Sequence, residues 1–317
     1  MNKHKRMPAF IYTYACRMDE RALCQMEMRS LFGIETKMNI LKTDVKVNPS
    51  RSPFIKERIE VLFEGNDLSE ILDQVQSIEL YESTFKVIFV KINDLDKSEK
   101  IEYKERRSIE RELGLRINGE FDFYQPDYEY GIVTMAGRWY FGIYRKSESI
   151  WFHHQKKPHE YSTALSTRVA RAITNIAIPN PDGVQAIDPC CGIGTVLVEA
   201  LSMGIDIVGR DINPQIIEGI NENLRYFGFE GDVSCGPISE ISEYYDVAII
   251  DLPYNLYTHT TLENQLSILK HARRIARKLV VISIETIDQM IEDTGLEIID
   301  RCIAKKGLFS RQILVCE

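Results

Sequence analysis

The sequence VAIIDLPY (247–254) carries the most specific chemical signal in the chain. An amino group conjugated to an aromatic ring is a poor nucleophile, because its lone pair is delocalised. The carboxylate of Asp251 and the main-chain carbonyl of Leu252 could accept both N–H hydrogens of such a group and localise the lone pair. Pro253 stiffens the turn, and Tyr254 could stack on the ring for about 1–3 kcal/mol. The alternative is structural: a turn cap, a strand end and a packed ring.

A glycine loop, DPCCGIGT (188–195), lies upstream of this tetrapeptide. Gly192 and Gly194 allow a sharp turn that leads into a helix N-terminus, which suits a carboxylate or a phosphate. Leu197 occupies the place of the third glycine of a dinucleotide fingerprint, which disfavours NAD. Asp211 follows about 20 residues later, where an acid can accept hydrogen bonds from a ribose. The two features together favour an adenosine-bearing cofactor, against a ligand-free turn and an Asp211 that only caps a helix.

The elements that must position these residues alternate from residue 184 onward, as in a parallel sheet covered by helices. The expected strands are 184–188, 205–211, 232–236, 246–251, 278–285, 296–306 and 308–316; the expected helices are 195–203, 214–227 and 262–276. The last two strands form a closing antiparallel hairpin. Seven strands in this order predict an α/β domain of the Rossmann-like methyltransferase class.

The first half is less regular and predicts an α+β region. Its expected strands are 9–17, 85–92 and two within 130–145, and its expected helices are 20–33, 67–83 and 102–117. The segment 153–162 is the expected linker.

Composition limits the function classes. The chain has 317 residues and a net charge of −8, and residues 1–160 are neutral overall, so the acidic excess lies in the second half. No basic excess extends over a whole domain, so a prediction of nucleic-acid binding depends on local basic patches. Seven cysteines without a Cys-x-x-Cys pair indicate reduced thiols and no zinc ribbon. With no long apolar run, a cytoplasmic protein without membrane or metal partners is expected.

The motifs DPCCGIGT, GRDINP and DLPYN together resemble the S-adenosylmethionine-dependent amino-group methyltransferases that carry an (Asp/Asn)-Pro-Pro-Tyr signature. The first half resembles a THUMP domain, an RNA-binding module, preceded by a ferredoxin-like segment. The combination is similar to the tRNA guanine-N2 methyltransferases. The resemblance implies a ferredoxin-like segment (1–65), a THUMP-like domain (66–152), a linker and leading helix (153–183) and a Rossmann-like methyltransferase domain (184–317).

The resemblance also implies site residues. The catalytic candidates are Asp251, Leu252, Pro253 and Tyr254; the cofactor-binding candidates are Asp188, Cys190, Gly192, Gly194, Thr195, Asp211, Ile212, Ser162 and Thr163. Ser162 or Thr163 would reach the cofactor carboxylate. Cys190 and its neighbour Cys191 are interpreted mainly as packing residues.

This chain departs from the pattern of that family in three places. Leu252 and Asn255 replace a proline and a glycine of the signature, and the usual acid beside the adenine is absent, so Asp232 or a main-chain N–H would have to serve.

RNA contact is predicted for local basic residues: Lys104, Arg106, Arg107, Arg111, Arg138, Lys156 and Lys157. The alternative is a solvated charged face, since acidic residues interrupt the first group. His153, His154 and His159 are interpreted as linker residues and not as metal ligands.

The predicted function is therefore methyl transfer from S-adenosylmethionine to the N2 amine of a guanosine in RNA, with tRNA favoured over rRNA by the resemblance. Adenine-N6 methylation, glutamine methylation and an RNA-binding protein with a degenerate catalytic domain stay open. The sequence leaves the oligomeric state undetermined.

Overall fold

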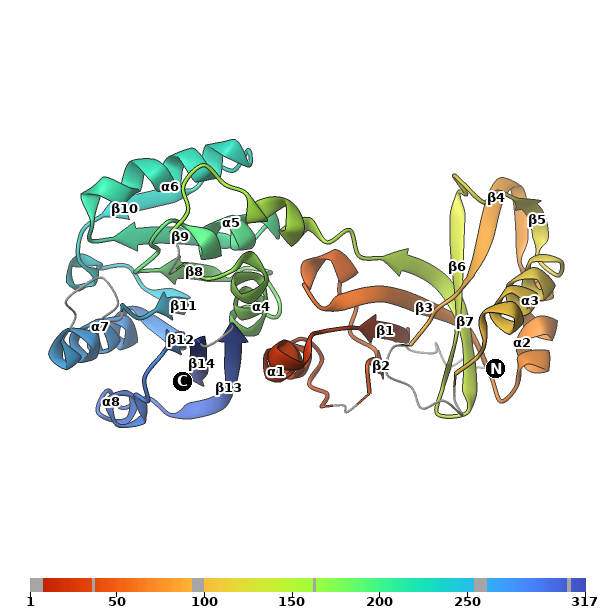
Figure 1. Ribbon diagram of the computed structural model, residues 1–317, viewed down its shortest axis with the longest axis horizontal. Helices are drawn as coiled ribbons and strands as arrows, with labels where there is room; N and C mark the ends of the chain where they lie inside the picture. The colour runs from red at the N-terminus through yellow and green to blue at the C-terminus, as the bar shows by residue number, and fades with distance from the viewer. Residues whose placement is uncertain (1–7, 36–37, 93–99, 162–163, 254–260, 307–308) are drawn as a thin grey trace, which may run out of the picture. The chain divides into compact units, whose positions relative to one another are not determined.

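The computed structural model describes residues 8–35, 38–92, 100–161, 164–253, 261–306 and 309–317. The chain divides into two compact units (Figure 1). Unit 1 comprises residues 1–15, 36–50 and 54–148; unit 2 comprises 16–35, 51–53 and 149–317. Among the described residues, no helix is both long and apolar enough to cross a membrane.

The sheet of unit 2 has seven strands in the order β10-β9-β8-β11-β12-β14-β13. They are β8 (Gln185–Asp188), β9 (Asp206–Asp211), β10 (Asp232–Cys235), β11 (Tyr245–Asp251), β12 (Ala276–Ser283), β13 (Ile298–Lys306) and β14 (Phe309–Cys316). The first five strands are parallel, and β14 is antiparallel to both β12 and β13. This order confirms the predicted Rossmann-like methyltransferase architecture. Strands β9 and β10 are added on one side of β8 and strands β11 and β12 on the other, so the topological switch point lies between β8 and β11.

Helices cover the sheet of unit 2: α4 (Thr167–Ala177), α5 (Thr195–Ser202), α6 (Pro214–Tyr226), α7 (Leu262–Ile275) and α8 (Asp288–Glu292). Helices α4 and α7 both contact β11 and β12 and lie on opposite sides of them (Figure 1). Residues 247–250 of β11 are therefore fully buried, and the strand reads as a continuous apolar run.

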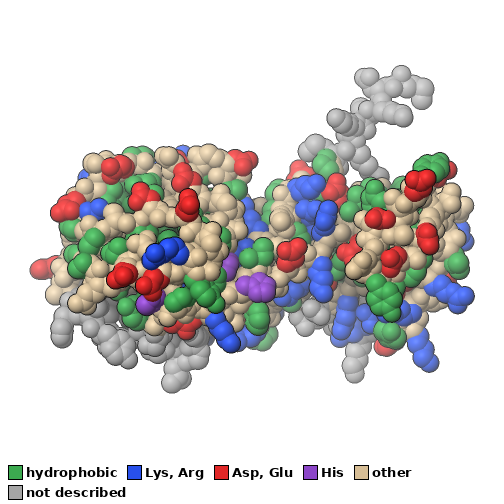
Figure 2. Space-filling model, turned by 90° about the horizontal axis from the view of Figure 1, so that it is seen from above, with side chains coloured by type: hydrophobic (Ala, Val, Ile, Leu, Met, Phe, Trp, Pro, Cys, Tyr) green, Lys and Arg blue, Asp and Glu red, His purple; other side chains and the backbone are tan. Residues whose placement is uncertain are grey.

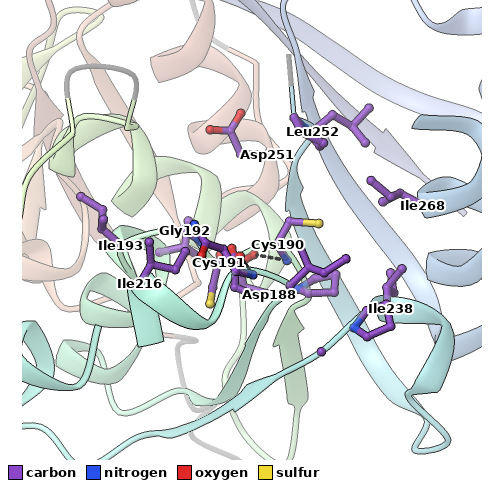
Figure 3. Close-up of a pocket in the computed structure, with 18 of the residues that line it drawn as sticks. Asp188, Cys190, Cys191, Gly192, Ile193, Ile216, Ile238, Asp251, Leu252 and Ile268 are labelled. Atoms are coloured by element: carbon purple, nitrogen blue, oxygen red, sulfur yellow. Dashed lines mark hydrogen bonds between the residues drawn. The ribbon is translucent and has the colours of Figure 1, made fainter. Parts of the chain in front are cut away.

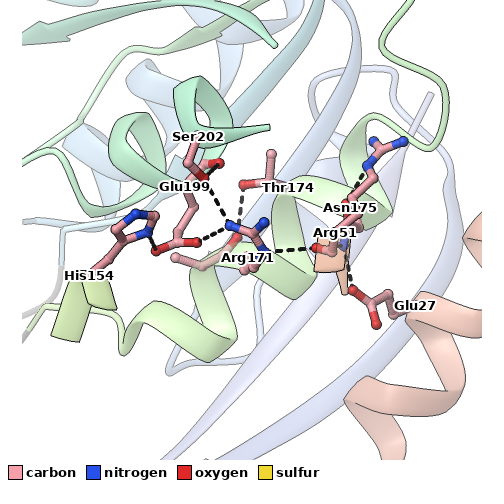
Figure 4. A network of polar contacts seen from close by, with 9 residues as sticks. Glu27, Arg51, His154, Arg171, Thr174, Asn175, Glu199 and Ser202 are labelled. Atoms are coloured by element: carbon pink, nitrogen blue, oxygen red, sulfur yellow. Dashed lines mark hydrogen bonds and ion pairs between the residues drawn. The ribbon is translucent and has the colours of Figure 1, made fainter. Parts of the chain in front are cut away.

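Helix α1 (Arg21–Phe32) comes from the N-terminal part of the sequence but packs in unit 2, against α4 and β13. Its Glu27 is completely buried and accepts hydrogen bonds from Ser52 Oγ and from Asn175 Nδ2 of α4 (Figure 4). Burial raises the pKa of Glu27 to about 7, although both hydrogen bonds act in the opposite direction. Arg29 forms a bidentate pair with Asp300 of β13.

Unit 1 is built on one sheet in the order β2-β1-β3-β7-β6-β4-β5. Its strands are β1 (Phe10–Tyr14), β2 (Ile40–Thr43), β3 (Ile55–Gly65), β4 (Glu79–Phe89), β5 (Asn118–Phe121), β6 (Tyr128–Met135) and β7 (Arg138–Lys146). Helices α2 (Leu68–Gln74) and α3 (Tyr103–Gly114) close a core that contains Ile71, Phe85, Leu113 and Phe141.

Two expectations differ from the structure of unit 1. The helix predicted over 67–83 is wrong in its second half, because α2 ends at Gln74 and β4 begins at Glu79. Cross-strand pairing of β4 with β5 and β6 outweighs the local helical pattern there. In addition, the expected boundary at residue 65 falls at the end of β3, inside a sheet that is continuous through the β3–β7 pairing.

Candidate functional site

Three neighbouring parallel strands of unit 2, β9, β8 and β11, each end in an aspartate: Asp211, Asp188 and Asp251. Parallel strands bring their carboxyl ends to one sheet edge, so the three side chains meet there. All three line a cavity of about 710 Å³ (Figure 3). The same cavity is lined by the predicted cofactor residues Cys190, Gly192, Thr195 and Ile212 and by the predicted catalytic residues Leu252 and Pro253.

The glycine loop is shaped by two positive φ angles, 51° at Gly192 and 77° at Gly194. Asp211 Oδ2 accepts a hydrogen bond from Gly192 N at 2.9 Å, so the end of β9 holds the loop in place. Asp211 Oδ1 accepts from Asn213 N, and Asn213, not Asp211, is the N-cap of α6. Gly194 is the residue of this motif that does not line the cavity, since it precedes α5 and faces Ile220.

The carboxyl groups lie in an environment that disfavours negative charge. Burial raises the pKa of Asp188 well above its usual range, and the charges of Asp251 and Asp211 act in the same direction. Burial also raises the pKa of Asp251 to about 6, partly offset by the positive charge of Arg311. A cationic ligand in the cavity would relieve this repulsion.

Cys190 and Cys191 remain protonated thiols in this site. Burial, reinforced by the charge of Asp188, raises the pKa of both residues. Protonated thiols are weak nucleophiles and weak metal ligands. Among the described residues, no group of three or more His, Cys, Asp or Glu side chains could hold a metal ion.

The turn after β11 is held from two sides. Leu252 N donates to Ile282 O of β12 at 3.0 Å, and Pro253 O accepts from Gln265 Nε2 of α7 at 2.9 Å. Tyr254 lies outside the described residues, as do Ser162 and Thr163.

The segment before α4 is tied to the rest of unit 2 by three hydrogen-bond contacts, two from its side chains and one from its main chain. His154 Nδ1 is 2.8 Å from Glu199 Oε1, and His159 N donates to Asn223 Oδ1 (Figure 4 shows the His154 contact). Lys157 Nζ donates to Thr195 Oγ1 at 2.9 Å, at the first residue of α5. The sequence predicts Lys157 as an RNA contact, whereas the structure directs its ammonium group to the wall of the cavity.

Sequence reasoning missed the residues that complete the cavity wall. They include Tyr161, Ile193, Ile216, Ile238, Ser239, Asn264, Ser267, Ile268 and His271. Four of them share one face of α7, at spacings of three, four and seven residues, which is the signal that could have found them. Asp232 is exposed and does not line the cavity. Residues 236–239 line it instead, in the region where the related family usually has an acid.

A second cavity of about 650 Å³ lies in unit 1 and has the opposite character. Three of the predicted RNA-binding residues line it, namely Arg106, Arg107 and Arg111, together with Lys86, Tyr103, Phe121 and Phe123. Arg106 and Arg107 lie over the ring of Tyr103, and Arg107 also pairs with Glu110 at 2.7 Å. Arg106 Nε is buried without a hydrogen-bond partner within the described segments.

The remaining predicted RNA contacts, Lys104, Arg138 and Lys156, are exposed and line neither of these two cavities. Figure 2 shows Lys and Arg side chains on the surface of unit 1 with acidic and hydrophobic ones between them. Charge on this surface is therefore mixed outside the cavity.

Comparison with known proteins bears on unit 2 most directly. Residues 154–286 match a methyltransferase family. It is the UPF0020 family, whose description is an RMKL-like methyltransferase domain. The match covers the cavity-lining loops and strands from β8 to β12.

The curated relatives include two archaeal proteins named tRNA (guanine(10)-N2)-dimethyltransferase. The chain is 35% identical to that of Methanothermobacter thermautotrophicus over 34% of this chain and 33% of the relative, and 29% identical to that of Pyrococcus abyssi over 64% and 62%. It is also 32% identical to the human U6 snRNA (guanine-N(2))-methyltransferase THUMPD2, over 29% of this chain and 20% of the relative. The aligned region thus spans less than two thirds of each relative.

Among solved structures, TrmN from Thermus thermophilus aligns with a TM-score of 0.48 at 13% identity, over 98% of this chain and 99% of the other. The fold assignment follows from the strand order itself.

Proposed function

We propose that the protein is an S-adenosylmethionine-dependent methyltransferase that modifies the exocyclic N2 amine of a guanosine in tRNA. The observation that carries the proposal is the cavity in which Asp251 and the turn after it face the glycine loop and two further aspartates. The match of residues 154–286 to a methyltransferase family and the names of the curated relatives support it.

The residues present fit this cofactor. When bound, it supplies an electrophilic methyl group on a positively charged sulfonium. A cavity with three carboxyl groups is complementary to such a cation, whose charge would favour their ionised forms. At the start of α5, free main-chain N–H groups and the ammonium group of Lys157 suit the carboxylate of the cofactor's amino-acid end.

The catalytic part belongs to Asp251 and Leu252. The Asp251 carboxylate and the Leu252 carbonyl accept the two hydrogens of the target amine and keep its lone pair localised for attack on the methyl group. Asp251 must be ionised for this role, and burial sets its pKa near 6, so the carboxylate predominates at neutral pH. Tyr254 would stack on the target base.

Unit 1 would hold the RNA; it contains most of the THUMP-like region proposed for residues 66–152 and the ferredoxin-like region proposed for 1–65 apart from residues 16–35 and 51–53, which belong to unit 2. Its cavity offers guanidinium groups for phosphate and aromatic rings for bases. Cytoplasmic localisation agrees with seven cysteines that are all free.

The deciding experiment is methyl transfer from labelled S-adenosylmethionine to separated tRNA and rRNA fractions that lack the modification, followed by nucleoside mass spectrometry. Labelled N2-methylguanosine from tRNA supports the proposal. Label in rRNA or as N6-methyladenosine would replace the substrate but keep the chemistry. Bound cofactor and bound RNA without any label would leave a binding protein with a degenerate catalytic domain.

A further inference from the structure

Gln265 lies in the first turn of α7, next to cavity-lining Asn264 but not itself on the cavity wall. Its side chain is 4% exposed, and its Nε2 donates a hydrogen bond to Pro253 O at 2.9 Å. Gln265 therefore contacts the turn after β11 without lining the cavity itself.

This contact distinguishes the carbonyl groups of Leu252 and Pro253, because only that of Pro253 is engaged by Gln265. The Pro253 carbonyl is occupied by Gln265, and the Leu252 N–H is occupied by Ile282 O at 3.0 Å. The peptide groups on both sides of the Leu252 carbonyl are thereby held in one orientation. The Leu252 carbonyl accepts no hydrogen bond from the part of the chain that the structure describes, and Leu252 lines the cavity.

Folding alone does not favour a glutamine at this position. Its Oε1 atom is buried and has no hydrogen-bond partner among the described residues, and a buried unpaired acceptor opposes stability. Nearby Leu269 and Ala272 of the same helix are fully buried apolar residues, so an apolar side chain of similar length would suit this layer better. The donor end of the side chain is what distinguishes glutamine here, and it acts on the turn.

We propose that Gln265 is a positioning residue that aligns the Leu252 carbonyl with the Asp251 carboxylate, so that both accept hydrogens of the same amine. This inference rests on the proposed function. It assigns to α7 a role in catalysis that is separate from its cavity-lining face.

The test compares Gln265→Met, which keeps the length of the side chain but removes the donor, with Lys270→Met, a polar-to-Met change at an exposed position of the same helix. For Gln265→Met we expect an unchanged or higher melting temperature and a Kd for S-adenosylmethionine within about twofold of the wild type. We expect kcat at saturating RNA to fall about 10- to 100-fold, because a small displacement of an acceptor group carries a cost of that size. Lys270→Met should match the wild type in all three measurements.

Gln265→Glu gives a second readout that a purely structural role would not move. A protonated glutamic acid can donate to Pro253 O and a carboxylate cannot, so kcat of this variant should recover relative to the wild type as the pH is lowered.

Two results would overturn the inference while leaving the proposed function intact: a Gln265→Met enzyme with wild-type kcat, or one that loses melting temperature, cofactor affinity and kcat together. A wild-type protein that methylates no RNA would remove the proposed function and this inference with it.

Discussion

The two units each contain a cavity of similar volume, about 710 Å³ in unit 2 and about 650 Å³ in unit 1, but the charges on their walls are opposite. Three aspartates line the first, whereas three arginines, a lysine and one glutamate, Glu110, line the second. The net charge of −8 for the whole chain indicates neither the acidic cavity nor the basic one. We propose from this difference that unit 2 takes a cationic ligand and unit 1 a polyanion, so that local placement of charge matters more than the total.

The comparison is tested most strongly at Asp251. Asp251→Ala should lower kcat about 10²- to 10⁴-fold, because it removes the ionised acceptor of the target amine. RNA affinity, which we propose depends on unit 1, should stay unchanged. Filter binding of labelled tRNA beside a methyl-transfer assay measures both, and an equal loss in the two assays would contradict the separation of roles.

The corresponding change in unit 1 is the triple variant Arg106→Ala, Arg107→Ala and Arg111→Ala. We expect tRNA affinity to fall by about 10- to 100-fold and the slope of log K against log salt concentration to fall by about 2 to 3, since each phosphate contact contributes about 0.7 to 0.9. The Kd of S-adenosylmethionine, measured by calorimetry, should not change. Lys104→Ala, on the same helix but outside the cavity, should have a much smaller effect; equal effects per charge would assign RNA binding to the helix surface.

The acidic cavity should also respond to pH where the basic one does not. The raised pKa of Asp251, about 6, predicts that kcat/KM falls by up to about tenfold per pH unit below pH 6, because the protonated group has lost its charge and accepts the amine hydrogen less strongly than the carboxylate does. Asp251→Asn should retain partial activity without this break, since an amide oxygen accepts hydrogen bonds at every pH. A wild-type profile that stays flat from pH 5 to 8 would remove the carboxylate from the mechanism.

The smallest expected effect separates two neighbouring lysines. Lys157→Met should weaken S-adenosylmethionine binding about 5- to 10-fold, a loss typical of one hydrogen bond, but leave binding of 5′-methylthioadenosine unchanged, since that ligand lacks the amino-acid carboxylate. Lys156→Met should leave both affinities unchanged, because Lys156 is exposed. If Lys157→Met instead weakened only tRNA binding and its salt dependence, Lys157 would be a phosphate contact.

The fold of unit 2 could be predicted because its signals are local. Apolar runs of strand length, Pro214 at the start of α6 and the glycines of the loop each act within a few residues, so the strands β8 to β14 and the helices α5, α6 and α7 begin and end close to their expected positions, whereas the short helix α8 was not predicted. Unit 1 was less predictable because non-local pairing outweighs its local signals. The stretch around Glu79 has a helical pattern but pairs as a strand with β5 and β6.

The chain alone indicates that Asp188, Asp211 and Asp251 end three of the parallel strands, and the rule that parallel strands share one carboxyl edge predicts that they come together. Three features depend on tertiary packing: α1 belongs to unit 2, Lys157 Nζ donates to Thr195 Oγ1, and Gln265 Nε2 donates to Pro253 O. The physical reason is that these contacts join residues separated by between 12 and about 150 positions, and their partners are set by packing and by the need to satisfy buried polar groups. No local pattern encodes such a choice.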